Sequence, residues 1–212
     1  MRINLIVSFF LQKLYNFIHM TTHISNKRIF LESYGCQMNE YDTELIRTIL
    51  TKENFAFVDS EAQADVVMLN TCSVRENANN KVYGRIHTIK HECREAGRKR
   101  PLIGILGCMA TNFRKALLEN PSLSIDFIAG PDSYKRLPDL IHECLKDEGR
   151  KTWDVTLSEY ETYSDVYPAR KEGVNAWIAV MRGCNNFCTF CVVPYTRGRE
   201  RSRPVENVLE EV

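Results

Sequence analysis

Short apolar runs alternate with segments of helical periodicity along the middle of the chain. Residues 65–69 and 102–106 are almost continuously apolar, which is typical of strands buried on both faces. Between such runs, apolar side chains recur every three or four residues, as on one face of a helix. The predicted strands are 28–34, 55–58, 65–69, 102–106 and 125–129, and the predicted helices are 40–52, 74–89, 113–119 and 137–145. This alternation predicts an α/β fold with an open parallel sheet over residues 27–150.

The pattern changes after this domain. Residues 151–173 are polar and rich in tyrosine, and we expect a linker there. A strand predicted over 174–181 and a helix opened by Pro204 begin a second domain over 174–212. The apolar residues on one face of that helix are Val205, Val208, Leu209 and Val212. Because nothing in the sequence follows to cover this face, we expect the chain to be a fragment of a longer protein.

The amino-terminal segment stands apart from the pattern. Residues 1–20 are largely apolar, with two basic residues and no acid, which resembles a signal peptide. Polar residues such as Lys13 interrupt the run, which is also too short to span a bilayer. We therefore interpret residues 1–26 as an extension outside the fold, from a start codon assigned upstream of Met20.

The composition is that of an ordinary soluble globular protein. Hydrophobic residues make up 44% of the chain and charged residues 26%, with a net charge of +1. The net charge therefore gives no overall electrostatic field that would attract a membrane or a polyanion, and any polyanion site must be a local patch. The 8 cysteines in 212 residues are fewer than a disulfide scaffold needs, so we expect a reducing cytoplasm.

Three cysteines follow three predicted strands at equal spacing. Cys36, Cys72 and Cys108 are 36 residues apart each time. Because the carboxyl ends of parallel strands share one edge of a sheet, these cysteines can converge. Three buried small residues are one alternative and zinc is another, although structural zinc usually takes four protein ligands. We expect an iron–sulfur cluster held by three thiolates. Cys93 and Cys144 lie inside predicted helices and are interpreted as structural.

A second set of cysteines, Cys184, Cys188 and Cys191, has the spacing C-x3-C-x2-C. Three thiolates fill three of the four iron positions of a cubane cluster and leave one iron open for a substrate or cofactor. A zinc knuckle lacking a ligand and a redox pair of Cys188 with Cys191 are alternatives, but neither explains the third cysteine. Phe190 is a candidate for packing either against a cofactor at the open iron or within the loop.

Four arginines alternate just after this motif, namely Arg197, Arg199, Arg201 and Arg203. In an extended segment, a period of two places all four on one side. Guanidinium groups bind phosphates and carboxylates bidentately, so the row is a candidate substrate-binding surface. The alternative is a solvated run of charge, and the sequence leaves the two interpretations equal.

Longer motifs around these cysteines resemble one protein family. Residues 33–39 (SYGCQMN), 70–78 (NTCSVRENA) and 107–110 (GCMA) resemble the amino-terminal domain of the methylthiotransferases. Residues 183–191 (GCNNFCTFC) and 193–203 (VPYTRGRERSR) resemble the start of their radical S-adenosylmethionine (SAM) domain. The resemblance runs from about residue 28 to the end of the chain, and it is strongest to the branch that modifies tRNA.

This resemblance implies a flavodoxin-like sheet followed by the truncated start of a radical-SAM partial TIM barrel. It implies two [4Fe–4S] clusters, an auxiliary one on Cys36, Cys72 and Cys108, and a second on the C-x3-C-x2-C cysteines, where the open iron binds SAM. The implied reaction transfers a methylthio group to C2 of N6-isopentenyladenosine next to the anticodon of a tRNA. The implied partners are the tRNA and a flavodoxin- or ferredoxin-type electron donor, and we expect a cytoplasmic monomer.

The chain departs from the family pattern because the rest of the barrel and a carboxy-terminal RNA-binding domain are missing. We therefore expect the fragment to be inactive alone. Two other functions stay open. One is a methylthiotransferase that acts on an aspartate of a ribosomal protein, and the other is a non-catalytic iron–sulfur or flavodoxin-like binding module.

Overall fold

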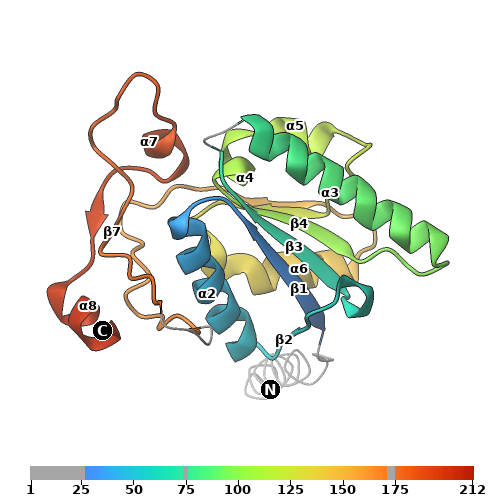
Figure 1. The fold of residues 1–212 in the computed structure, drawn as a ribbon, viewed down its shortest axis with the longest axis horizontal. Helices are drawn as coiled ribbons and strands as arrows, with labels where there is room; N and C mark the ends of the chain where they lie inside the picture. Colours follow the sequence, from blue (N-terminus) through green and yellow to red (C-terminus); the bar gives the residue numbers. More distant parts are fainter. Residues whose placement is uncertain (1–26, 74–75, 171–174) are drawn as a thin grey trace, which may run out of the picture.

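A six-stranded parallel sheet forms the centre of the molecule (Figure 1). The computed structural model describes residues 27–73, 76–170 and 175–212, so the predicted extension over residues 1–26 lies outside the described residues. The strand order is β2-β1-β3-β4-β5-β6, and every neighbouring pair is parallel. The strands are β1 (Arg28–Tyr34), β2 (Ala56–Phe57), β3 (Val66–Thr71), β4 (Leu102–Gly107), β5 (Phe127–Ala129) and β6 (Thr152–Asp154). The prediction of an open parallel α/β sheet is confirmed.

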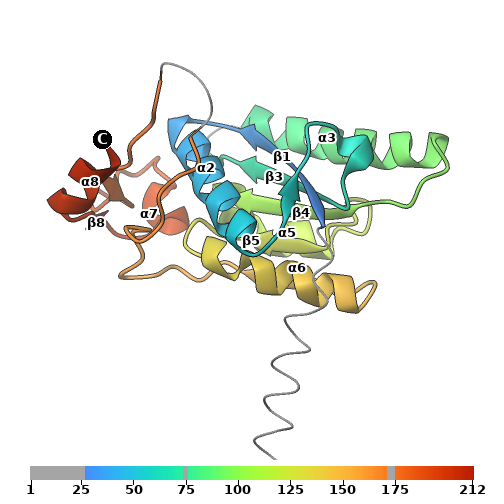
Figure 2. The same cartoon turned by 90° about the horizontal axis from the view of Figure 1, so that it is seen from below.

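Helices cover both faces of this sheet, and Figure 2 shows α3 and α6 on opposite sides of it. The helices of this domain are α2 (Gln37–Lys52), α3 (Glu76–Glu95), α4 (Cys108–Asn112), α5 (Arg114–Glu119) and α6 (Leu137–Lys146). Strand β3 explains the two layers, because its side chains alternate between the faces. Val66 and Met68 pack with α2 and α6, whereas Val67 and Leu69 pack with α3 and α5.

The segment expected to be a linker contributes the edge strand of the sheet. Thr152–Asp154 pairs with β5 in parallel, and Thr152 and Asp154 are buried while Trp153 is 48% exposed. Farther along, Tyr163 and Val166 join the core on the α2 side of the sheet. A three-residue strand among polar residues is too short to give a clear hydrophobic period, so the sequence pattern did not reveal it.

The carboxy-terminal segment lies beside the carboxyl ends of the strands, as both views show (Figures 1 and 2). It contains β7 (Met181–Arg182), α7 (Val193–Thr196), β8 (Arg201–Ser202) and α8 (Val205–Glu211). β7 and β8 form an antiparallel ribbon, and residues 175–180 are not a strand, so the predicted strand over 174–181 is wrong there. The truncated start of a radical-SAM partial TIM barrel, expected here, stays a prediction.

The helix predicted after Pro204 is confirmed as α8, and Pro204 occupies the position that caps its amino end. Val205 and Leu209 are 67% and 68% exposed, so the apolar stripe lies open to solvent in this chain. None of the helices in the described ranges combines the length and the apolar character needed to cross a bilayer.

Candidate functional site

The cysteines Cys36, Cys72 and Cys108 lie at the ends of three neighbouring strands. Tyr34, Thr71 and Gly107 stand side by side in the register of β1, β3 and β4. Cys72 and Cys108 each follow this row by one residue, and Cys36 follows it by two. Adjacent strands are about 4.8 Å apart, so the fold brings residues that are distant in sequence to one edge of the sheet.

Two glycines allow the backbone to pass closely between these cysteines. A Cβ atom on Gly35 would lie 2.6 Å from the Cβ of Cys72. A Cβ atom on Gly107 would lie 2.5 Å from the carbonyl oxygen of Thr71, and Gly107 has a φ of +84°. Both the contact and the left-handed conformation exclude a larger residue at Gly107.

Cys36 lies in an environment that favours its thiolate form. The side chain of Cys72 lowers the pKa of Cys36 to about 5, with help from the backbone N–H groups of Asn39 and Met38 and from Arg197. Cys36 immediately precedes α2, where backbone N–H groups have no partner within the helix. A lowered thiol pKa is a property of cysteines that bind metals or react as nucleophiles.

Cys108 is contacted by a residue of the distant carboxy-terminal segment. The Nε of Arg197 donates to the Sγ of Cys108 over 3.1 Å. This contact is possible because α7 packs on α4, which begins at Cys108. Cys108 and Cys72 are 6% and 8% exposed, whereas Cys36 is exposed.

The donor chemistry of this first set fits a cluster bound by thiolates. None of the eight cysteines, all of which are described, is in a disulfide. Cys36 contacts Cys72, and Cys108 carries a hydrogen bond of the kind that supports a thiolate ligand. Over residues 27–73, 76–170 and 175–212, however, no three His, Cys, Asp or Glu side chains stand close enough to hold a metal ion. The sheet therefore collects the donors at one edge without forming a closed metal site.

The second set lies in the loop between β7 and α7. The N–H of Cys184 donates to the carbonyl of Gly198 over 3.1 Å, and the N–H of Cys191 donates to the carbonyl of Cys188 over 2.9 Å. A Cβ atom on Gly183 would lie 2.0 Å from the carbonyl oxygen of Arg199, so the loop closes against the backbone that follows α7. Cys188 is exposed and the other two thiols are partly buried.

Phe190 extends from this loop into solvent. Its side chain is 91% exposed, so the alternative of packing within the loop is wrong. Phe187 instead makes the aromatic contacts, with Tyr195 at 6.2 Å between ring centroids and with the guanidinium of Arg199 at 5.2 Å. Packing of Phe190 against a cofactor stays a prediction.

The four alternating arginines do not share one side. Arg197, Arg201 and Arg203 are buried, and only Arg199 is exposed. Arg201 makes a bidentate pair with Asp132 at 2.7 and 3.0 Å, and Arg203 donates to Tyr41 at 3.1 Å and pairs with Glu211. Both a common substrate-binding row and a solvated run of charge are therefore wrong for these three residues. Each of them finds a buried acceptor that is distant in sequence or belongs to α8.

Asp42 joins the two cysteine sets through arginines. Its two carboxylate oxygens accept from Arg182 and Arg197, each at 2.8 Å, and Tyr134 donates to it at 3.2 Å. Burial alone would raise the pKa of Asp42, but Arg182 and then Arg197 hold the pKa below its usual range. Arg182 lies two residues before Cys184, and Arg197 touches Cys108.

Sequence reasoning missed Asp42, although the chain carries a signal for it. Asp42 stands at the spacing of one helix face with Leu45, Ile46 and Ile49, all of which are buried. A carboxylate on the apolar face of a helix requires a buried partner, because an unpaired charge in a core is costly. Such a position is therefore a marker for an internal ion pair.

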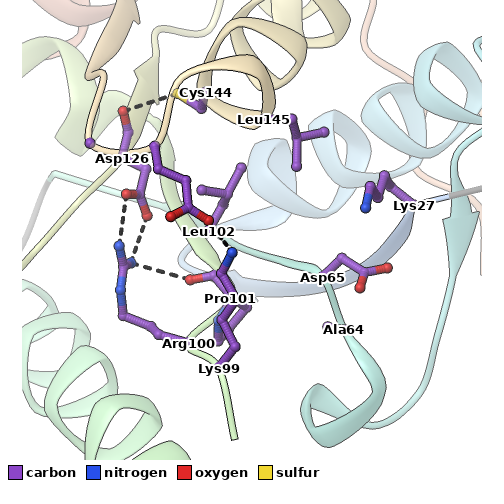
Figure 3. A pocket seen from close by; sticks show the side chains of 12 residues that line it. Lys27, Ala64, Asp65, Lys99, Arg100, Pro101, Leu102, Asp126, Cys144 and Leu145 are labelled. Atoms are coloured by element: carbon purple, nitrogen blue, oxygen red, sulfur yellow. Dashed lines mark hydrogen bonds and ion pairs between the residues drawn. The ribbon is translucent and has the colours of Figure 1, made fainter. Parts of the chain in front are cut away.

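A hollow of about 450 Å³ lies at the opposite edge of the sheet (Figure 3). Its charges neutralise one another. Arg100 pairs bidentately with Asp126 at 2.6 and 2.8 Å, and Lys99 pairs with Glu148. Cys144 donates to the carbonyl of Asp126 over 3.4 Å, which agrees with its structural interpretation. This hollow is at the amino ends of the strands, away from the edge where ligands of parallel sheets bind.

Comparisons with known proteins give the family. Residues 28–130 match a protein family described as "Uncharacterized protein family UPF0004". A tRNA-2-methylthio-N(6)-dimethylallyladenosine synthase of Chloroherpeton thalassium is 46% identical over 195 residues, which are 90% of this chain and 42% of the relative. The chain belongs to the family of these synthases.

Other relatives of the same name agree. The protein of Prosthecochloris aestuarii is 46% identical over 186 residues, covering 88% of this chain and 41% of the relative. The protein of Porphyromonas gingivalis is 43% identical over 191 residues, covering 88% of this chain and 40% of the relative. The family resemblance is thus confirmed, and this chain spans about two fifths of the length of these relatives.

Proposed function

We propose that this protein is a radical-SAM methylthiotransferase that modifies C2 of N6-isopentenyladenosine next to the anticodon of a tRNA. The observation that carries the proposal is the placement of Cys36, Cys72 and Cys108 on three adjacent strand ends, next to the segment that bears the C-x3-C-x2-C motif. The names of the relatives support tRNA as the substrate. A flavodoxin- or ferredoxin-type donor, a monomeric state and a cytoplasmic location belong to the same proposal.

In this proposal, the strand-end set Cys36, Cys72 and Cys108 holds an auxiliary [4Fe–4S] cluster. Cys184, Cys188 and Cys191 hold the cluster to which SAM binds. When bound, the two clusters and SAM supply the radical chemistry and the sulfur that an unreactive aromatic C–H bond requires.

The protein's own residues place these two cysteine sets relative to each other. Asp42 on α2 accepts from Arg182, which precedes the second set, and from Arg197, which touches Cys108 of the first. Because the three groups are almost fully buried, their mutual attraction is poorly screened by solvent. We assign to this ion-pair network the role of docking the SAM-binding loop onto the sheet.

The experiment that tests the proposal is anaerobic reconstitution of the chain with iron and sulfide. About eight irons per chain are expected, because each cubane cluster holds about four. Cys72→Ala and Cys188→Ala should each remove about half of the iron, and the matched control Cys93→Ala, at a buried helical cysteine, should remove none. Binding of a single zinc, or iron content that ignores both substitutions, would refute the cluster assignment.

The substrate is tested in a strain that lacks the gene. Nucleosides from its tRNA should contain no 2-methylthio-N6-isopentenyladenosine, and a plasmid that carries the complete gene should restore it. An unchanged nucleoside profile would exclude tRNA as the substrate. Loss of a methylthio group from a ribosomal protein of the same strain would then identify the alternative methylthiotransferase.

A further inference from the structure

Arg197 is held between an acid and a cysteine sulfur. Its Nη2 donates to Asp42 Oδ2 at 2.8 Å, and its Nε donates to Cys108 Sγ at 3.1 Å. The side chain is 7% exposed, so water does not compete for these contacts. Because a guanidinium is planar and rigid, the two hydrogen bonds together fix where the donor meets the sulfur.

Asp42 is itself fixed on several sides. Arg182 donates to its other carboxylate oxygen, and also to the carbonyl of Pro131 at 3.0 Å. Tyr134 donates to Asp42 as well, and the ring of Tyr163 lies 4.9 Å from the guanidinium carbon of Arg182. The position of Arg197 is therefore set by a buried framework that extends across the domain.

The charges of this framework do not balance. Three guanidiniums, on Arg182, Arg197 and Arg201, face two carboxylates, on Asp42 and Asp132. Buried charge without a counter-charge is costly, so this excess of one cation calls for a nearby anion. Cys108 supplies the sulfur that the excess cation touches.

We propose that Arg197 is a positioning residue that orients the Cys108 sulfur and raises the reduction potential of the cluster bound there. This inference rests on the proposed function. The reduced form of a cluster carries one more negative charge than the oxidised form, so a hydrogen bond and a positive charge at a ligand sulfur stabilise the reduced form more. Arg199, two residues further along and exposed, makes no such contact in the described part of the chain.

The test uses the full chain with Cys184, Cys188 and Cys191 replaced by Ala, reconstituted anaerobically so that a single cluster is measured. Arg197→Lys keeps a positive charge but replaces the rigid planar fork, which reaches Cys108 and Asp42 through two different nitrogens, by a single flexible ammonium nitrogen. Its midpoint potential, from a redox titration followed by electron paramagnetic resonance, should be lower than that of the parent at equal iron content. The matched control Arg199→Lys should have the potential of the parent.

An equal potential for the Arg197→Lys and parent proteins, with iron content and far-ultraviolet circular dichroism unchanged, would overturn the inference and leave the proposed function intact. Failure of the parent to bind iron would instead overturn both. A second measurement needs no substitution at Arg197. In the parent labelled with ¹⁵N-arginine, pulsed electron paramagnetic resonance of the reduced cluster should show a hyperfine coupling to ¹⁵N. The absence of this coupling would also overturn the inference.

Discussion

Asp42 and Arg182 form an ion pair whose side chains are 0% and 1% exposed, with Arg182 Nη1 2.8 Å from Asp42 Oδ1. The two residues are 140 positions apart in sequence and belong to α2 and β7. The pair therefore joins the helix after the first strand to the strand before the C-x3-C-x2-C loop. Breaking this pair should therefore weaken the packing of the carboxy-terminal segment on the sheet domain, and the loss can be measured as a change in stability.

Removing the charge of Asp42 should destabilise the protein strongly. Asp42→Asn leaves Arg182 and Arg197 buried with reduced compensation, and breaking a buried pair in this way costs about 3–5 kcal/mol. The free energy of unfolding, from urea titration followed by circular dichroism, measures the loss. Asp59→Asn, at an exposed acid, is the control and should change little. Equal stabilities for the two variants would contradict the role given to the pair.

Acidification should weaken the fold through His142. Burial, and then Lys146, lower the pKa of His142, whose ring stacks on Phe55 at 5.3 Å between centroids. Because the folded state has the lower pKa, the stabilising contribution is present above the unfolded value of about 6.5 and is lost as the pH falls through the folded value.

The measurement compares unfolding free energies at about pH 7.5 and about pH 5, on either side of the histidine range. His142→Phe keeps a ring against Phe55 and should lose less stability on acidification than the parent. His91→Phe, at a histidine whose side chain is 70% exposed, should behave like the parent. A parent and a His142→Phe protein with the same pH dependence would remove His142 as the cause.

The hydroxyl of Tyr163 should be needed for docking of the segment that follows β6. It accepts from the N–H of Tyr134 at 3.0 Å and donates to the carbonyl of Pro131 at 3.0 Å, in a fully buried position. Tyr163→Phe keeps the ring but leaves the buried N–H of Tyr134 without its acceptor, which costs about 1–3 kcal/mol. The carbonyl of Pro131 keeps its hydrogen bond from Arg182. Tyr160→Phe, at a tyrosine that is 86% exposed, is the control for thermal unfolding. A Tyr163→Phe protein as stable as the control would show that these hydrogen bonds do not matter.

Two glycine substitutions should have opposite effects. Gly107→Ala places a methyl group 2.5 Å from a carbonyl oxygen at a φ of +84°, so we expect a loss of about 1–3 kcal/mol and a displaced Cys108. Gly84→Ala lies within α3, with nothing within 4 Å of the new methyl group, and should gain up to about 1 kcal/mol. Chemical denaturation of both variants measures the contrast. A stabilising Gly107→Ala would mean that the backbone beside Cys108 is not constrained as described.

The elements of the sheet domain were predictable because their signals are local. Runs such as β3 and β4 are apolar on both faces, and the apolar residues of α2 and α6 recur at helical spacing. The placement of Cys36, Cys72 and Cys108 just after strands was also a local signal. Since parallel strands share one edge for their carboxyl ends, the sequence alone determined that these thiols face the same edge.

Only the tertiary structure decided which strands are neighbours and which charged side chains pair inside the protein. The order β1-β3-β4 brings the three cysteines to adjacent strands. The short strand β6 forms by pairing with the edge of β5. Arg197 and Arg201 look like surface arginines in sequence, but each meets a buried acid across many residues. Hydrophobic periodicity records how one element meets the core, whereas a buried ion pair depends on two distant elements at once, and no local pattern contains that information.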